Sequence, residues 1–303
     1  MSIFIDENGF GSSNYSKIKT KHPKDSITNV MDEKVSYAVL THKYINKAYL
    51  DKMPNLKHIQ LLTAGYDNID LNLLKENKIS LSIARDVFSN AIAEDIITKM
   101  LVINRHVKKY VSQMPDGLWE RHQKAYEITG STIGFLGTGS IASFCANKLK
   151  GFDVKLIGYR NKNKPHPLFN DIYTGQDGLN YVIKNSDYLI VTLPLNQSTY
   201  QILSKEKLQL MKPDAVLINV GRGKLVDQEA LINMLQLDLI RGAALDVMDP
   251  EPLNKENPLW QMDNVYLTPH IAGSSKYMLE RLYDLVEKNI DNYINGLPLS
   301  HII

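Results

Sequence analysis

Short apolar runs alternate with polar segments of helical length along most of the chain. In the first 90 residues the apolar runs lie at 2–5, 37–40, 56–62 and 79–83. From Ser131 to Gly273 the rhythm is clearer, and it predicts strands at 131–136, 153–159, 187–193, 215–219, 243–247 and 264–268. Strands that alternate with helices in this way predict α/β units built on parallel sheets.

Several helices can be placed from apolar spacing and capping residues. A helix begins near Asn90, and its apolar face comprises Ile92, Ile96, Ile97, Met100, Leu101 and Ile103. Ser204 and Asp227 are suited to cap helices over 204–212 and 227–235. An amphipathic helix over 274–294 follows the last strand, and we expect it to pack back on the N-terminal unit. The pattern after Ser131 is that of a doubly wound sheet, with the N-terminal unit discontinuous in sequence.

Composition narrows the class of protein. The chain has 303 residues, of which 44% are hydrophobic and 22% charged, as in ordinary globular proteins. A net charge of +2 gives no reason to expect binding to nucleic acid or to an anionic membrane. No signal peptide or transmembrane span is apparent, and the single cysteine, Cys145, cannot form an internal disulfide. We expect a cytoplasmic protein without a metal site.

A glycine-rich turn follows the predicted strand at 131–136. Gly137 permits the tight turn, Gly139 lets the backbone approach a pyrophosphate, and Ala142 is small enough for close helix–strand packing. The next helix would offer its N–H groups and positive dipole end to the phosphates. The predicted coenzyme contacts here are Gly137, Thr138, Gly139, Ser140 and Ile141.

The second strand of this unit ends at Arg160, where an NAD-specific enzyme typically carries an acidic residue. A guanidinium attracts the 2′-phosphate of NADP and can bind it in bidentate fashion. Asn161 and Lys162 follow directly and could contribute. We therefore predict a preference for NADP, with NAD possible; the alternative is a basic surface loop without a role in coenzyme binding.

Three polar residues follow successive predicted strands: Arg222, Glu251 and His270. Ligands of such sheets bind at the carboxyl ends of the strands, so these side chains should converge. Arg222 can hold the carboxylate and carbonyl oxygen of a 2-keto acid, and His270 is the natural proton donor as hydride reaches carbon. Glu251 would hold the imidazole and favour its charged form.

Each of these residues also has an ordinary interpretation when taken alone. A single Arg is usually a surface cation, a Glu before Pro is usually a loop residue, and a His is usually structural. The joint position of the three after a nucleotide turn favours the catalytic reading. His42, His58, His106 and His122 lack such a setting and are interpreted as structural.

With these motifs the chain resembles the D-isomer-specific 2-hydroxyacid dehydrogenases. The resemblance extends from about Asn55 to the C-terminal helix. Besides the glycine turn, the matching segments are 64–70, 87–94, 193–195, 219–223, 246–252 and 268–270. In that family the matching Arg, Glu and His form the catalytic set.

The resemblance implies more than the residues alone. It implies a flavodoxin-like substrate domain of residues 1–92 and 276–303, a Rossmann coenzyme domain of residues 93–275, and a homodimer formed through the coenzyme domain. Backbone N–H groups near Ala64 and Gly65 would help to bind the substrate carboxylate. Further implied coenzyme contacts are Leu193, Pro194, Val220, Gly221, Asp246 and His270, with Asp246 receiving the nicotinamide amide. Arg160 departs from the commoner acid and points to members that resemble NADP-dependent glyoxylate or hydroxypyruvate reductases.

A different class of function stays open. Relatives of this fold also serve as nucleotide-sensing binding proteins or corepressors in which turnover is incidental. The sequence does not choose among glyoxylate, hydroxypyruvate, pyruvate and a branched 2-keto acid. It also leaves the physiological direction of the reaction undetermined.

Overall fold

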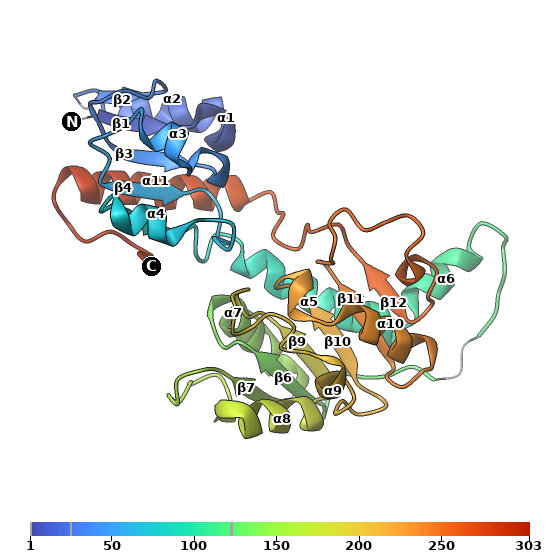
Figure 1. The fold of residues 1–303 in the computed structure, drawn as a ribbon. Coiled ribbons are helices and arrows are strands. Elements are labelled where there is room, and N and C mark those ends of the chain that lie inside the picture. Colours follow the sequence, from blue (N-terminus) through green and yellow to red (C-terminus); the bar gives the residue numbers. More distant parts are fainter. Residues whose placement is uncertain (1, 25, 122–123) are drawn as a thin grey trace. The chain divides into compact units, whose positions relative to one another are not determined.

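The computed structural model describes residues 2–24, 26–121 and 124–303. The chain divides into two compact units, which comprise Met1–Phe88 with Ser275–Ile303 (unit 1) and Ser89–Ser274 (unit 2). Figure 1 shows both units as layered α/β structures. Of the helices in the described residues, none combines the length and apolar character needed to cross a membrane.

Unit 1 is built on a parallel sheet of five strands. The strands are β1 (Ser2–Ile5), β2 (Ser26–Thr28), β3 (Val35–Leu40), β4 (His58–Leu61) and β5 (Ser80–Ser82). Their spatial order is β2-β1-β3-β4-β5, which is the flavodoxin order. The predicted fold class is confirmed for this unit, although the sequence did not predict β2.

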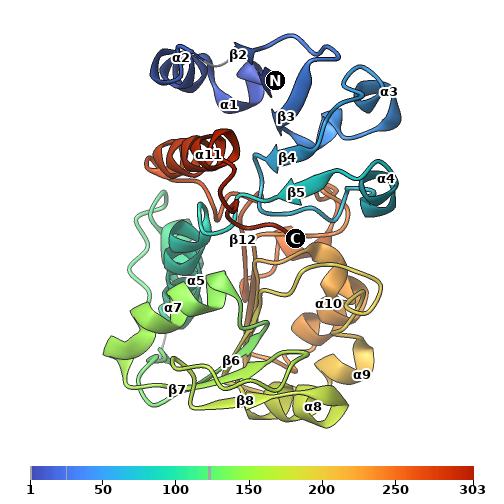
Figure 2. The ribbon, with the colours of Figure 1, turned by 90° about the vertical axis from the view of Figure 1, so that its left-hand side faces the viewer.

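Helices cover both faces of the unit 1 sheet. On one face lie α1 (Glu7–Phe10), α2 (Ser12–Lys21) and α11 (Met278–Ile294), and on the other lie α3 (Lys47–Leu50) and α4 (Leu71–Glu76) (Figure 2). In α11 the buried apolar residues Leu282, Val286 and Ile290 recur every four positions, so one stripe faces the core. The chain therefore returns to its first unit through this helix, which begins at Met278 rather than at 274.

Unit 2 contains a parallel sheet of seven strands. The strands are β6 (Thr132–Leu136), β7 (Lys155–Tyr159), β8 (Asp171–Tyr173), β9 (Tyr188–Val191), β10 (Val216–Asn219), β11 (Gly242–Leu245) and β12 (Val265–Leu267). Their order is β12-β11-β10-β9-β6-β7-β8. The chain runs from β6 to β7 on one side and returns to β9 on the other. Ligands of doubly wound sheets bind at this switch point, outside the carboxyl ends of the strands.

Two helical layers enclose the unit 2 sheet. One layer contains α5 (Ser89–Asn104) and α7 (Ser140–Leu149), and the other contains α8 (Gly175–Asn185), α9 (Lys205–Leu208) and α10 (Gln228–Gln236) (Figure 2). The short helix α6 (Val107–Gln113) follows α5. Helix α5 spans the domain boundary predicted at residues 92 and 93.

The sequence pattern does not account for three local features of unit 2. Phe144 is an apolar residue of α7, but its exposed fraction is 39%, whereas the smaller Ala142 and Ala146 are buried. Ser204 does not cap α9, because its hydroxyl donates to the Glu206 carboxylate at 2.7 Å. The sequence also gave no indication of β8.

Candidate active site

The glycine turn after β6 has the geometry that a pyrophosphate requires. Gly137 has a φ of +100°, which favours glycine, and an added Cβ would lie 3.1 Å from the backbone nitrogen of Leu193. Gly139 precedes α7 without a capping side chain, and open space surrounds the position of an added Cβ. The first turn of α7 can therefore receive an anion on its backbone N–H groups. A dinucleotide coenzyme fits this cradle.

Two threonines fix the position of the turn. The Thr192 hydroxyl, directly after β9, donates to the Gly137 carbonyl oxygen at 2.9 Å. Thr138 is buried, and its methyl group packs over Gly158, where an added Cβ would collide with it. Sequence reasoning missed Thr192; its place between a buried strand and the Leu193-Pro194 segment was the available signal. Replacing either contact would shift the backbone that faces the coenzyme.

Arg160 lies at the end of β7, and its N–H donates to the Tyr173 carbonyl oxygen of β8 at 3.1 Å. The segment after it folds toward α7, since His166 contacts the Ser143 hydroxyl through Nε2 at 3.1 Å. The pKa of His166 is lowered by burial and by the nearby positive charge of Arg160. The guanidinium is therefore close to the segment that contacts the first turn of α7. Asn161 and Lys162 are exposed beside it.

Arg222 is held in a tight loop after β10. The buried Asn219 side chain bonds both sides of this loop, accepting from the Gly221 N–H at 3.0 Å and donating to the Arg222 carbonyl oxygen at 2.9 Å. An Arg222 Nη1 donates to the Gly221 carbonyl oxygen at 2.8 Å. Gly223 packs against the Met248 carbonyl group, where an added Cβ would collide. The loop after β10 is thus in direct contact with the loop after β11 that carries Glu251.

Glu251 and His270 form a hydrogen-bonded pair. His270 Nδ1 lies 2.8 Å from Glu251 Oε2, and the Met248 N–H donates to Glu251 Oε1 at 3.1 Å. The carboxylate is therefore fixed by the backbone while it fixes the imidazole. Because Nδ1–H faces a carboxylate, Nε2 is the ring atom that can exchange a proton with a ligand. About half of the imidazole is exposed, at 49%, so a ligand can reach it.

The backbone around His270 is also held. His270 has a φ of +53°, which is uncommon for a residue with a side chain. Its N–H donates to the Asp246 carbonyl oxygen at 2.8 Å. The Asp246 carboxylate, only 2% exposed, accepts the N–H groups of Ile271 and Ala272, each at 3.0 Å. Asp246 thus shapes the loop that presents the imidazole.

The remaining predicted residues are distributed over both units. Leu193, Pro194, Val220 and Gly221 follow β9 and β10 at the same edge of the unit 2 sheet as the glycine turn. Ala64 and Gly65 lie in unit 1, in the loop after β4, where the Thr63 hydroxyl donates to the Gly65 carbonyl oxygen at 2.9 Å.

The other histidines have structural surroundings. Burial lowers the pKa of His58 to about 4. His106 Nε2 bonds the Lys124 carbonyl oxygen at 2.6 Å, and His42 lies in a short 3-10 turn, His42–Tyr44. His122 lies outside the described residues.

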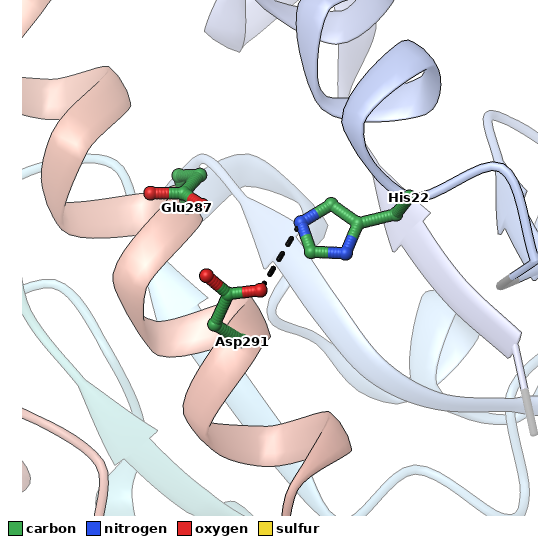
Figure 3. A group of neighbouring side chains, drawn as sticks. All are labelled: His22, Glu287 and Asp291. Carbon is green, nitrogen blue, oxygen red and sulfur yellow. Dashed lines mark ion pairs between the residues drawn. The ribbon is translucent and has the colours of Figure 1, made fainter.

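Figure 3 shows a separate group of titratable side chains in unit 1. Glu287 and Asp291, one turn apart on α11, face His22 at the end of α2, and His22 Nε2 lies 3.5 Å from Asp291 Oδ1. The Lys21 ammonium is paired with Glu287, which raises the pKa of this lysine. A metal ion would have to displace that ammonium, so we interpret the group as an ion-pair contact between α2 and α11.

Comparison with known proteins settles the family. The sequence model of the D-isomer specific 2-hydroxyacid dehydrogenase NAD-binding domain matches residues 97–272. The chain belongs to the D-isomer-specific 2-hydroxyacid dehydrogenases. It is 32% identical to the glyoxylate reductase of Pyrococcus furiosus over 90% of this chain and 83% of that protein. It is also 32% identical to glyoxylate/hydroxypyruvate reductase B of Yersinia pestis (strain Pestoides F), over 84% of this chain and 78% of that protein.

Solved structures of similar proteins include two bound to phosphorylated coenzyme. An acyclic imino acid reductase in complex with NADPH and D-Arg has a TM-score of 0.86 at 28% identity, covering 100% of both chains. The NADPH-dependent glyoxylate/hydroxypyruvate reductase of Sinorhizobium meliloti, in complex with NADP and malonate, has a TM-score of 0.78 at 25% identity. That match covers 95% of this 2-hydroxyacid dehydrogenase and 93% of the other chain. The prediction of the family is confirmed.

Proposed function

We propose that this dehydrogenase reduces a small 2-keto acid to the D-2-hydroxy acid with NADPH. The observation that carries the proposal is the His270–Glu251 hydrogen bond, 2.8 Å long, at the sheet edge that also bears the glycine turn and the Arg222 loop. Glyoxylate and hydroxypyruvate are the proposed substrates, because relatives that are 32% identical carry these names.

Each residue has one task in this mechanism. The Arg222 guanidinium binds the substrate carboxylate and carbonyl oxygen and stabilises the charge that develops on that oxygen. His270 donates the Nε2 proton to the same oxygen, and Glu251 stabilises the imidazolium and fixes its orientation. The bound coenzyme supplies the hydride. In the reverse direction the neutral imidazole accepts the proton of the alcohol.

Each unit of the chain has its own proposed role. Residues Met1–Phe88 and Ser275–Ile303 form the proposed substrate domain, and Ser89–Ser274 form the coenzyme domain. The N–H groups near Ala64 and Gly65 are proposed to bind the substrate carboxylate. The Asp246 carboxylate is proposed to accept the nicotinamide amide.

Arg160 is the basis for the proposed NADP preference. Two structural relatives are described as binding NADPH or NADP, and the Arg160 guanidinium is close to the segment that contacts the first turn of α7. Replacement Arg160→Asp should therefore reverse the preference. A charged hydrogen bond contributes about 1.5–3 kcal/mol, so we expect the NADPH:NADH ratio of kcat/KM to fall about 10- to 100-fold. Steady-state kinetics with both coenzymes measures this ratio.

The matched control is Lys205→Asp, which changes the charge equally at the exposed start of α9. Its coenzyme ratio should equal that of the wild type. A wild-type enzyme that favours NADH, or an Arg160→Asp variant with an unchanged ratio, would contradict the role of Arg160.

The proposed activity is tested with a panel of glyoxylate, hydroxypyruvate, pyruvate and a branched 2-keto acid, each with NADPH. We expect turnover with at least one small 2-keto acid. Tight NADPH binding without turnover of any of them would favour the nucleotide-sensing alternative.

The resemblance to an acyclic imino acid reductase gives the panel a second arm, in which ammonia or methylamine is added to form the imine. Turnover that requires the amine would assign C=N reduction, with His270 protonating nitrogen.

We also propose a homodimer formed through unit 2. Lys108 on α6 donates to the Met262 carbonyl oxygen at 2.5 Å, which anchors one side of this helix to its own unit. Further along the chain, the exposed fractions of Val111, Met114 and Trp119 are 56%, 74% and 90%. Exposed large apolar side chains in one segment of the chain are the basis for this proposal.

A further inference from the structure

Helix α5 buries a lysine completely. Lys99 has an exposed fraction of 0%, and its helix packs against strands β10, β11 and β12. Its ammonium is paired with Asp95, one turn earlier on the same helix. A buried ammonium is costly unless it is paired and hydrogen-bonded, so its presence between apolar residues calls for a reason.

Lys99 also begins a chain of hydrogen bonds with one possible direction. Its Nζ donates to Thr268 Oγ1 at 2.9 Å, and Thr268 Oγ1 donates to Asp246 Oδ1 at 2.6 Å. An ammonium can only donate, and a hydroxyl has a single proton to give. Thr268 must therefore accept from Lys99 and direct its proton to the carboxylate. Thr268 and Lys99 are 169 residues apart in sequence.

This chain of hydrogen bonds ends on the loop that carries the proposed proton donor. Asp246 accepts the N–H groups of Ile271 and Ala272 through its two carboxylate oxygens, and its carbonyl oxygen accepts the His270 N–H. These bonds enclose the one residue of the loop with a positive φ, His270 at +53°. A conformation of this kind persists when the surroundings over-determine it.

Charge gives Lys99 a second effect on the same loop. Burial raises the pKa of Asp95, the Asp246 charge raises it further, and Lys99 opposes both. The Asp95 and Asp246 carboxylates thus repel one another, and the Lys99 ammonium is the compensating charge. Without it, the repulsion from Asp95 would act on the carboxylate that accepts the N–H groups of the His270 loop.

We propose that Lys99 is a positioning residue for the reaction, acting through Thr268 and Asp246 to hold the His270 loop in its working conformation. The proposal rests on the proposed function of His270, which it deepens. Lys99 itself touches neither substrate nor reacting atoms in this account. Its contribution is to fix the direction of the imidazole relative to the bound keto acid.

Thr268→Val tests the relay, because it removes the hydroxyl and leaves the Lys99–Asp95 pair in place. A displacement of about 1 Å can cost about 100-fold in rate, so we expect kcat to fall about 10- to 100-fold. The KM for NADPH should change much less than kcat, since the glycine turn and the first turn of α7 still hold the phosphates. Thr268→Ser keeps the hydroxyl and should retain most of the activity. Thr98→Val, which removes a hydroxyl bonded to the Glu94 carbonyl oxygen on the exposed side of α5, should leave kcat unchanged.

Lys99 is tested directly by Lys99→Met combined with Asp95→Leu. Replacing a buried ion pair by apolar residues is often neutral for stability, so the double variant should fold even where Lys99→Met alone does not. We expect its melting temperature to be close to that of the wild type while kcat stays low. Restored stability together with wild-type kcat would show that Lys99 merely balances Asp95, and would overturn the proposal.

A measurement without substrate separates this proposal from the proposed function. Hydrogen exchange of the Ile271 and Ala272 amides should be at least about tenfold faster in Thr268→Val than in the wild type, since their acceptor is loosened. Faster exchange together with an enzyme that reduces no keto acid would support the relay and reject the function. Unchanged exchange and unchanged kcat in Thr268→Val would contradict the relay, whatever the substrate.

Discussion

Replacing His270 by alanine should lower kcat for 2-keto acid reduction by about 10³-fold, because the carbonyl oxygen would lose its proton donor. The affinity for NADPH should change far less, since the glycine turn and α7 hold the phosphates. Steady-state kinetics with the keto acid and a fluorescence titration with NADPH measure the two effects.

Glu251→Gln tests whether His270 needs the negative charge of its partner or only the hydrogen bond. An amide oxygen can still accept from His270 Nδ1, at the position where the carboxylate lies 2.8 Å away, but the negative charge is lost. We expect an intermediate loss of kcat, smaller than that of His270→Ala. Equal losses of turnover and coenzyme binding in His270→Ala would assign the histidine a structural role and contradict the mechanism.

Replacing Arg222 by alanine should impair both substrate binding and turnover. The guanidinium binds the carboxylate in the ground state and stabilises the developing oxyanion in the transition state, so KM should rise while kcat falls. Loss of one such stabilising group typically costs about 10²- to 10³-fold in rate. We therefore expect kcat/KM to fall by at least about 10³-fold, measured with the best 2-keto acid of the panel.

Arg222→Lys separates charge from geometry. A lysine keeps the positive charge but cannot form two parallel bonds to a carboxylate, so it should recover only part of the lost activity. Added guanidinium ion should partly rescue Arg222→Ala. An Arg222→Ala enzyme with unchanged KM for the keto acid would exclude the proposed role in substrate binding.

The sequence predicted those parts of the fold that are specified locally. Buried strands such as β6 and β10 are mainly apolar runs, and Gly137, with its φ of +100°, marks a turn whose geometry favours glycine. The pairing of Glu251 with His270 followed because parallel strands end at the same edge of a sheet. Periodicity and topology together therefore located the candidate site.

The features that were missed depend on distant partners. Strands β2 and β8 have three residues each and lie at sheet edges, so their neighbours define them more than their own pattern does. Lys99 was missed because an ammonium on an apolar face is explained only by its contact with Thr268. Phe144 shows that an apolar residue of an amphipathic helix is not necessarily buried, because its side chain is 39% exposed.

Transfer of a labelled hydride tests the central claim most directly. The purified protein is incubated with glyoxylate and NADPH that carries deuterium at C4 of the nicotinamide ring, using each of the two stereospecifically labelled forms. One of the two forms should yield a 2-hydroxy acid with deuterium at C2, and His270→Ala should form this product about 10³-fold more slowly. Absence of labelled product from any 2-keto acid of the panel, while NADPH remains bound, would contradict it.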